Sequence, residues 1–290
     1  MKLQAHVPAT VANLGPGFDS MAVAVDIGNE ISVDTEAPDE VVVEGEGGGT
    51  LPVDRTNLVV RSMAQVAREA GLELPPLSVR CRNEIPLERG LGSSAAAVVG
   101  GLVLADRLLS THLSPQALLE MAEVLEGHVD NAAAALHGGM VLAYREAGTG
   151  WRAERLRPAP GLRPVLLVPE EERLSTLAAR KALPNQVSLE AASFNAARAA
   201  LLVLALTSAP HLLREALRDR LHQGSRLRLA PASDELFRRL VLAGVPTCVA
   251  GSGPSLLAFE DEATSVPDPG PGWRVLRTRI DPRGIQVHVP

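Results

Sequence analysis

Aromatic side chains and cysteines are both scarce in this sequence of 290 residues. Aromatic residues make up 2% of the chain, and the net charge is −6. A nucleic-acid partner is not expected, because nucleic acids bind concentrated positive charge and aromatic stacking platforms. The only two cysteines, Cys81 and Cys248, lie far apart and show no paired metal spacing. This usage argues against a disulfide-stabilised secreted protein and predicts a reducing, cytoplasmic location.

Long hydrophobic runs are also missing. The most apolar stretches, Leu91–Leu109 and Ala196–Thr207, are interrupted by Gly, Ser, Asp or Arg, and the N-terminus lacks the apolar core of a signal peptide. We therefore expect no membrane attachment. Hydrophobic residues at 46% and charged residues at 21% are ordinary for a globular protein. A chain of this length is expected to form about two domains.

Hydrophobic periodicity predicts an α+β protein in which strands and helices interleave. The stretch Ala147–Pro160, rich in Gly, Pro and Arg, is the candidate boundary between lobes at residues 1–155 and 156–290. The first lobe has predicted strands at Lys2–Val7, Val23–Val33, Leu77–Cys81 and Met140–Tyr144, and helices at Asn57–Ala70, Ser93–Leu109 and Ser114–Leu125. The second lobe has predicted helices at Ser175–Ala182, Leu189–Thr207, His211–Leu221 and Ser233–Ala243, and strands at Pro164–Val168, Thr247–Ala250, Ser255–Phe259, Arg274–Ile280 and Ile285–Val289.

The segment Pro86–Gly101, PLERGLGSSAAAVVGG, is the most informative part of the sequence. It follows a predicted strand and opens a long helix of small residues, so the backbone N–H groups of residues 92–95 lie at a helix N-terminus. Such groups bind phosphate oxygens, and glycine allows the anion to approach the backbone closely. The segment lacks the Gly-Lys-Ser/Thr sequence of a P-loop. It also lacks the glycine spacing of the dinucleotide-binding motif. The alternative interpretation is an N-cap turn before a buried, alanine-rich helix.

Three further segments are individually ordinary. Val7–Ser20, VPATVANLGPGFDS, is a strand followed by a loop whose Asn and Asp are typical of turns. Glu126–Gly139, EGHVDNAAAALHGG, clusters polar residues before an alanine run, which a capped helix start also explains; the absence of a second His at i+4 makes zinc a poor candidate. Gly251–Ser255, GSGPS, joins two apolar strands as a turn or as a second glycine-rich wall for an anion.

Taken together, these segments resemble the signature motifs of the GHMP kinases in their order, their spacing and their amino-acid sequence. Val7–Ser20 is similar to the first signature motif of that family, Pro86–Gly101 to the second and Val249–Phe259 to the third. Within the family the chain is most similar to the homoserine kinases, which have a segment like EGHxDN after the second motif. The resemblance extends from Val7 to about Asp261. It implies a two-lobed α+β fold, with an N-terminal lobe like ribosomal protein S5 domain 2 and a ferredoxin-like C-terminal lobe.

The resemblance also implies that ATP and magnesium bind at the second motif. Ser94 and Glu126 would hold Mg²⁺, with Glu123 as the alternative to Glu126. Two protein oxygens together with phosphates and water suit this small, hard cation. The residues implied to contact ATP are Pro86, Gly90, Leu91, Gly92, Ser93, Ser94 and Ala95.

By the same resemblance, an amino-acid acceptor binds beside the ATP. Asp19 would pair with the substrate ammonium, and Arg180 and Arg226 would hold its carboxylate, because guanidinium forks match a carboxylate in two hydrogen bonds. Arg228 could exchange roles with Arg226. The residues implied to bind the acceptor are Asn13, Asp19, His128, Asn131, Arg180, Arg226, Gly251, Ser252 and Gly253.

The implied reaction transfers the γ-phosphoryl group of ATP to the side-chain hydroxyl of L-homoserine, a step of threonine biosynthesis. Asp19, Ser94 and Glu126 are the implied catalytic residues. A loose phosphoryl-transfer transition state needs little early deprotonation, so we expect Asp19 to orient the substrate rather than to act as an obligatory base. The alternatives are a GHMP kinase with another acceptor, such as a mevalonate-type alcohol, and a catalytically silent ligand-binding relative. A homodimer is expected from the family alone.

One segment departs from the family pattern. Relatives usually place a helix between the third motif and the last strands, but here Glu260–Trp273 contains TSVPDPGPGW, which cannot sustain a helix. We therefore predict that the second lobe lacks this helix. The expected consequence is a sheet face that is exposed or covered by a partner subunit.

Overall fold

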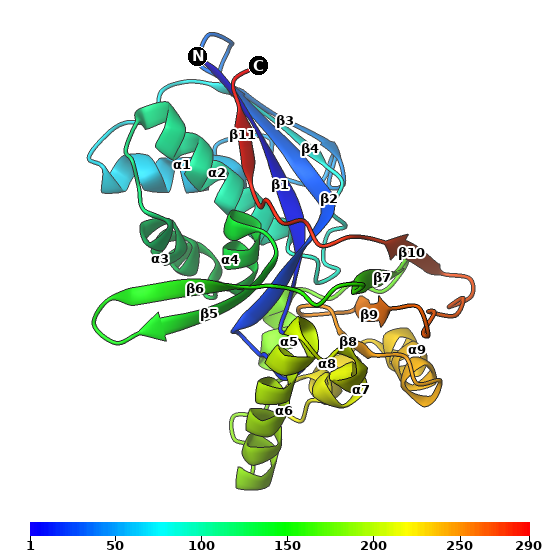
Figure 1. Ribbon diagram of the computed structural model, residues 1–290. Coiled ribbons are helices and arrows are strands. Elements are labelled where there is room, and N and C mark those ends of the chain that lie inside the picture. The colour runs from blue at the N-terminus through cyan, green and yellow to red at the C-terminus, as the bar shows by residue number, and fades with distance from the viewer.

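The computed structural model describes all 290 residues, and its first sheet has seven strands (Figure 1). The strand order is β11-β1-β2-β4-β3. In addition, β5 pairs with the N-terminal end of β2, and β6 pairs with β5. Most neighbours are antiparallel, and only β3 and β4 run parallel. The strands are β1 (Lys2–Ala12), β2 (Met21–Asp34), β3 (Glu40–Gly45), β4 (Ser78–Asn83), β5 (Met140–Glu146), β6 (Gly150–Leu156) and β11 (Gln286–His288).

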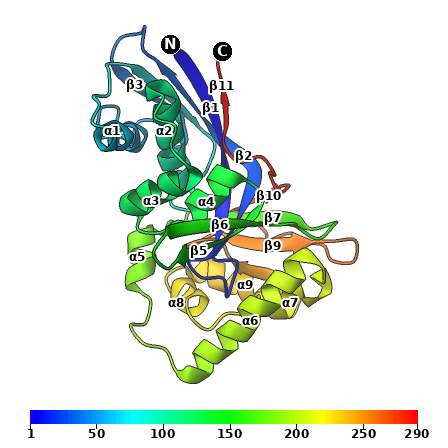
Figure 2. The same cartoon turned by 60° about the vertical axis from the view of Figure 1, so that its left-hand side comes forward.

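Four helices lie together on one side of this sheet, as both views show (Figures 1 and 2). Their ends are set by local chemistry: at the start of α3, the Ser114 hydroxyl accepts a hydrogen bond from Ala117 N–H and Pro115 occupies the first helical position. Gly127 ends that helix with a left-handed backbone, φ 78°. The helices are α1 (Leu58–Glu69), α2 (Ser93–Leu109), α3 (Pro115–Glu126) and α4 (Asp130–His137).

The second sheet has four strands in the order β10-β7-β9-β8 and is covered on both faces. Alternate residues of β7 explain this: Val165 and Leu167 pack with Leu240 of α9, whereas Leu166 packs into the main core with Leu202 of α6. The elements of this region are β7 (Arg163–Pro169), α5 (Thr176–Lys181), α6 (Leu189–Thr207), η1 (Pro210–Leu212), α7 (Leu213–Ala216), α8 (Gln223–Leu227), α9 (Pro231–Leu242), β8 (Thr247–Val249), β9 (Leu256–Glu260) and β10 (Trp273–Arg277).

The predicted helix over 211–221 is wrong beyond its first residues. The chain forms η1 and the short α7, and residues 217–222 are irregular. The physical reason is the Asp219 carboxylate, which accepts hydrogen bonds from the backbone N–H groups of residues 221–223 and so offers the chain an alternative to helical pairing. The strands β3 and β6 were not predicted, and β6 occupies the expected boundary stretch.

The segment between β9 and β10 has no helix, as predicted. The expectation that a sheet face would lie open there is wrong. Val266, 3% exposed, packs from this extended segment into the cluster of α9 and the second sheet. The extended segment therefore covers part of this face itself.

The two regions are interwoven at the C-terminus. β11 comes from the range assigned to the second lobe, yet it pairs with β1 at the edge of the first sheet. The division at residue 155 remains a prediction. The last strand, β11, follows that residue in the sequence but belongs to the first sheet of the structure.

Helix α6 projects from the body of the protein, with its N-terminal end free of the other elements (Figures 1 and 2). It is the one helix long and apolar enough to cross a membrane, and only 22% of its apolar window is buried. Leu189 at its start is 86% exposed and Leu204 near its end is 48% exposed.

Candidate active site

A cleft of about 690 Å³ gathers nearly all of the predicted site residues. The loop after β1, the turn before α2 and the start of α4 line it from the first region of the fold, and α5, α8 and the turn after β8 line it from the second. Gly253 is the one predicted site residue that does not line the cleft. The roles of the other residues remain predictions, but the structure brings all of them together in one cleft.

The turn before α2, where phosphate is predicted to bind, forms one side of the cleft from main-chain atoms, and this side is called the phosphate side below. Gly92 is the N-cap of α2 with φ 73°, and no side chain caps the helix. The backbone N–H groups of residues 93–95 therefore point from the positive end of a 17-residue helix. A side chain at Gly92 would strike Thr10 Oγ1, so only glycine allows this turn to lie against β1.

The glycines of the third motif support the phosphate turn from behind. A Cβ added to Gly90 would strike the carbonyl of Ala250, and a Cβ added to Gly251 would lie 2.6 Å from the Gly90 carbonyl. Two backbones cross here in direct contact. This crossing accounts for Gly253 as well, because its backbone lies beneath Gly90 rather than at the cleft surface.

Ser94 and Glu126 lie together at the mouth of the phosphate side. The Ser94 hydroxyl donates a hydrogen bond of 2.5 Å to Glu126 Oε1. The alternative carboxylate, Glu123, lies 3.8 Å from Arg145 and does not line the cleft. No group of three or more His, Cys, Asp or Glu side chains that could hold a metal ion is present. The hydroxyl of Ser94 and the carboxylate of Glu126 are oxygen ligands of the kind that magnesium takes together with phosphates and water, so this pair could hold that ion.

His128 lines the same cleft as this pair. Its Nδ1 is 2.9 Å from Asp130 Oδ1, and only 10% of its side chain is exposed. Burial alone would lower the pKa of His128, but the hydrogen bond and charge of Asp130, together with the charge of Glu126, raise the pKa above its ordinary value.

Asp19 and Arg180, both predicted to bind the acceptor, contact each other at the other side of the cleft, which is called the acceptor end below. Arg180 donates two hydrogen bonds to the Asp19 carboxylate, of 2.8 and 3.1 Å. The backbone of Asp19 has φ 51°, and its N–H donates to Asn13 Oδ1 at 3.0 Å. Asn13 Nδ2 in turn donates to the Gly251 carbonyl at 2.9 Å, so both ends of the Asn13 amide are engaged within the chain.

Arg226 is the buried cation of the acceptor end. It is 3% exposed, and its Nη1 donates to the Gly251 carbonyl at 2.6 Å while its Nε has no partner. Burial lowers the pKa of Arg226 to about 10, which leaves the guanidinium charged at neutral pH. Arg228 is exposed and bonds only to Ser225. The structure therefore brings Arg226, and not Arg228, into the cleft.

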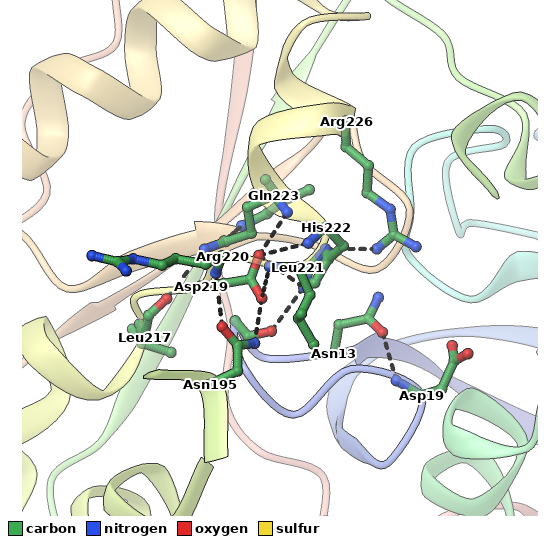
Figure 3. A network of polar contacts seen from close by, with 12 residues as sticks. Asn13, Asp19, Asn195, Leu217, Asp219, Arg220, Leu221, His222, Gln223 and Arg226 are labelled. Carbon is green, nitrogen blue, oxygen red and sulfur yellow. Dashed lines mark hydrogen bonds and ion pairs between the residues drawn. The ribbon is translucent and has the colours of Figure 1, made fainter. Parts of the chain in front are cut away.

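A buried polar network behind Arg226 was missed by the sequence reasoning (Figure 3). Asp219 accepts three backbone N–H bonds and one from the Asn195 amide, and His222 contacts both the Gly15 carbonyl and Arg226. The available signal was the mostly polar stretch Asp219–Gln223, in which the predicted helix His211–Leu221 ends.

With this geometry established, comparison with known proteins identifies the family. The GHMP kinases N terminal domain matches residues 57–139, which hold the phosphate turn, Ser94 and Glu126. The homoserine kinase of Mycolicibacterium vanbaalenii is 48% identical over 266 residues, covering 89% of this chain and 84% of that relative. The chain belongs to the homoserine kinase family of the GHMP kinases. This confirms the resemblance and, with it, a kinase that uses ATP as co-substrate.

Other homoserine kinases match along nearly their whole length. The homoserine kinase of Streptomyces avermitilis is 41% identical over 292 residues, covering 98% of this chain and 95% of the relative. The crystal structure of homoserine kinase from Cytophaga hutchinsonii superposes with a TM-score of 0.82 at 27% identity, covering 99% and 97% of the two chains. Mevalonate diphosphate decarboxylase from Staphylococcus aureus shares the fold at a TM-score of 0.67 and 14% identity. The predicted α+β GHMP kinase fold is confirmed.

Proposed function

We propose that this protein transfers the γ-phosphoryl group of ATP to the side-chain hydroxyl of L-homoserine, giving O-phospho-L-homoserine and ADP. One observation carries the choice of acceptor: a carboxylate, Asp19, and two guanidinium groups, Arg180 and Arg226, converge beside the N-terminus of α2. An amino-acid zwitterion needs this combination, an anion for its ammonium and cations for its carboxylate. The identity of the relatives as homoserine kinases supports the same acceptor.

In this proposal, the two sides of the cleft divide the work. The amides of residues 93–95 bind phosphate oxygens, and Ser94 and Glu126 hold Mg²⁺. When bound, the metal would neutralise charge on the phosphates. The acceptor end fixes the hydroxyl group near the nucleotide, and positioning supplies most of the rate because the transition state is loose.

The acceptor must displace an existing ion pair. Arg180 and Asp19 are bound to each other, each about one-third exposed. The ammonium group of homoserine would take the Asp19 carboxylate, and the released Arg180 would join Arg226 on the carboxylate. Asp19 then orients and neutralises the substrate, while His128 and Asn131 lie near the hydroxyl group.

A coupled assay of ADP release tests this proposal with four acceptors: homoserine, threonine, serine and mevalonate. We expect the highest kcat/KM with homoserine. Preference for mevalonate, which has no ammonium group for Asp19, would contradict the assignment and favour another GHMP kinase activity. No turnover with any acceptor, in protein that binds ATP, would favour a catalytically silent relative.

We also propose that two copies of the chain pair through α6 in the cytoplasm. The exposed side of α6 is apolar, and its acidic residue Glu190 is already paired with Arg220 of the same chain. A second copy would present the same apolar face, and a two-fold dimer pairs identical patches. Both cysteines are free and buried, which agrees with a reducing compartment. Leu204→Glu should convert a dimer into a monomer by light scattering, and a monomeric wild type would contradict the pairing.

A further inference from the structure

His222 occupies a fully enclosed position between the two halves of the acceptor site (Figure 3). Its Nε2 is 2.7 Å from the Gly15 carbonyl, and its Nδ1 is 3.0 Å from Arg226 Nη1. A carbonyl can only accept a hydrogen bond and a guanidinium can only donate one. The ring must therefore be neutral, with its hydrogen on Nε2 and the lone pair of Nδ1 facing Arg226.

The surroundings of His222 agree with an uncharged ring. Asp219 Oδ2 lies 3.9 Å from Nε2, but its oxygens are occupied by backbone N–H groups and the Asn195 amide. Phe18 stacks on the imidazole with ring centroids 5.2 Å apart, and Arg226 lies 5.4 Å from the centre of the Phe18 ring. Burial lowers the pKa of His222 to about 4, and the charge of Arg226 acts in the same direction.

The Gly15 contact connects His222 to the loop that carries Asn13 and Asp19. Gly15 has φ 71°, and a Cβ there would strike the carbonyl of Leu217, so the loop lies directly on the segment before His222. Arg226 reaches the same loop by a second route, because the Gly251 carbonyl accepts hydrogen bonds from both Arg226 and Asn13. His222 thus closes a ring of contacts that fixes Arg226 relative to Asp19.

We propose that His222 is a positioning residue of the acceptor site, which holds Arg226 at a set distance from the loop bearing Asp19. The site would then accept a carboxylate and an ammonium group borne on one carbon, as in an α-amino acid, and would discriminate against acceptors that carry one charge. This inference rests on the proposed function. The inference adds a residue that contacts neither ATP nor the acceptor but determines the geometry in which the acceptor is bound.

Steady-state kinetics of His222→Phe test the inference. Phenylalanine keeps a ring against Phe18 and removes both hydrogen bonds. We expect the KM for homoserine to rise about tenfold, the effect of one lost hydrogen bond to a charged group, while the KM for ATP stays within twofold. His222→Asn places an amide oxygen near the Nδ1 position, where it can still accept from Arg226, and should recover most of the homoserine KM.

A double-variant cycle separates positioning from general structural damage. If His222 acts through Arg226, adding His222→Phe to Arg226→Ala should lower kcat/KM by less than twofold further. Multiplicative losses, or equal rises in the KM for ATP and for homoserine, would overturn the inference. If the Phe variant does not fold, His222→Asn and His222→Gln provide the same comparison, with Asn expected to keep the lower homoserine KM because Gln directs its amide toward Gly15.

A control variant and the wild type complete the experiment. His211→Phe changes an exposed histidine on η1 and should leave all constants within twofold of wild type. Wild-type turnover of homoserine with unchanged constants in His222→Phe would overturn the inference and leave the proposed function standing. Absence of wild-type homoserine turnover would overturn both.

Discussion

In the proposed function, the two sides of the cleft would recognise charge by different means. The phosphate side would use main-chain N–H groups at the start of α2, and its demand on side chains is chiefly that Gly90 and Gly92 have none. The acceptor side would use three charged side chains, Asp19, Arg180 and Arg226, from three separate segments of the sequence. A site built from backbone depends on a short run of sequence, whereas a site built from side chains depends on how distant segments pack.

The largest expected effect tests the one carboxylate on the phosphate side. Glu126→Gln should lower kcat about a thousandfold, because loss of a metal ligand removes several kcal/mol of charge stabilisation from the transition state. Glu123→Gln is the matched control, one helical turn away and paired with Arg145, and should remain within twofold of wild type. Steady-state kinetics with varied Mg²⁺ measure both. A reversed order of the two effects would assign the metal to Glu123.

On the acceptor side, Arg226→Ala should raise the KM for homoserine about a hundredfold, since it leaves a bound carboxylate without its buried partner. The KM for ATP should change little, because the phosphate side does not use this residue. Arg228→Ala, two positions away and exposed, should behave like wild type. Equal effects of the two variants on homoserine binding would contradict the assignment of the carboxylate to Arg226.

A pH experiment sharpens the contrast, because the main-chain amides do not titrate and His222 does. Its pKa is about 4 in the folded protein and about 6.5 when unfolded, so the unfolded chain binds more protons between these values. Stability should therefore fall as the pH drops from 6.5 toward 4, by about 2 kcal/mol at pH 5 from this group.

Urea unfolding at pH 7 and pH 5 measures this loss. Wild type should lose about 2 kcal/mol more free energy of unfolding than His222→Phe between the two pH values. His137, whose pKa is lowered by burial, and His128, whose pKa is raised, are present in both proteins and cancel in the comparison. The same pH dependence in both proteins would mean that His222 is protonated in the fold.

The smallest effect concerns the role of Asp19. Asp19→Asn keeps the shape and removes the charge that pairs with Arg180, and it should raise the KM for homoserine about tenfold, at least as much as it lowers kcat. A pH–rate profile distinguishes orientation from base catalysis. Loss confined to kcat, with one limb of the profile removed, would make Asp19 a general base.

The contrast between the two sides also explains what the sequence could reveal. The phosphate turn was predictable because strand, glycines and helix follow one another in one segment, and local rules govern each. The placement of Gly251 behind Gly90 was not, since two backbones cross there at long range. The motif resemblance named Arg180 and Asp19, but their mutual ion pair spans 161 positions and became visible only in the folded chain.

His222 was missed for a different physical reason. Apolar residues at helical spacing predicted a helix that ends at residue 221, and this pattern gave no role to His222, the residue that follows it. The Asp219 carboxylate instead captures three backbone N–H groups, ends the helical path and turns His222 inward. A side-chain competitor for backbone hydrogen bonds overrode the periodicity.

The pairing of β11 with β1 joins two strands that lie far apart in the sequence. During synthesis, β1 leaves the ribosome long before β11 and meanwhile has one edge without its neighbour. The first sheet is therefore completed only after the second region has been made, even though most of its strands are encoded early. A truncation that removes β11 would leave the edge of β1 open to other chains, which is a route to aggregation.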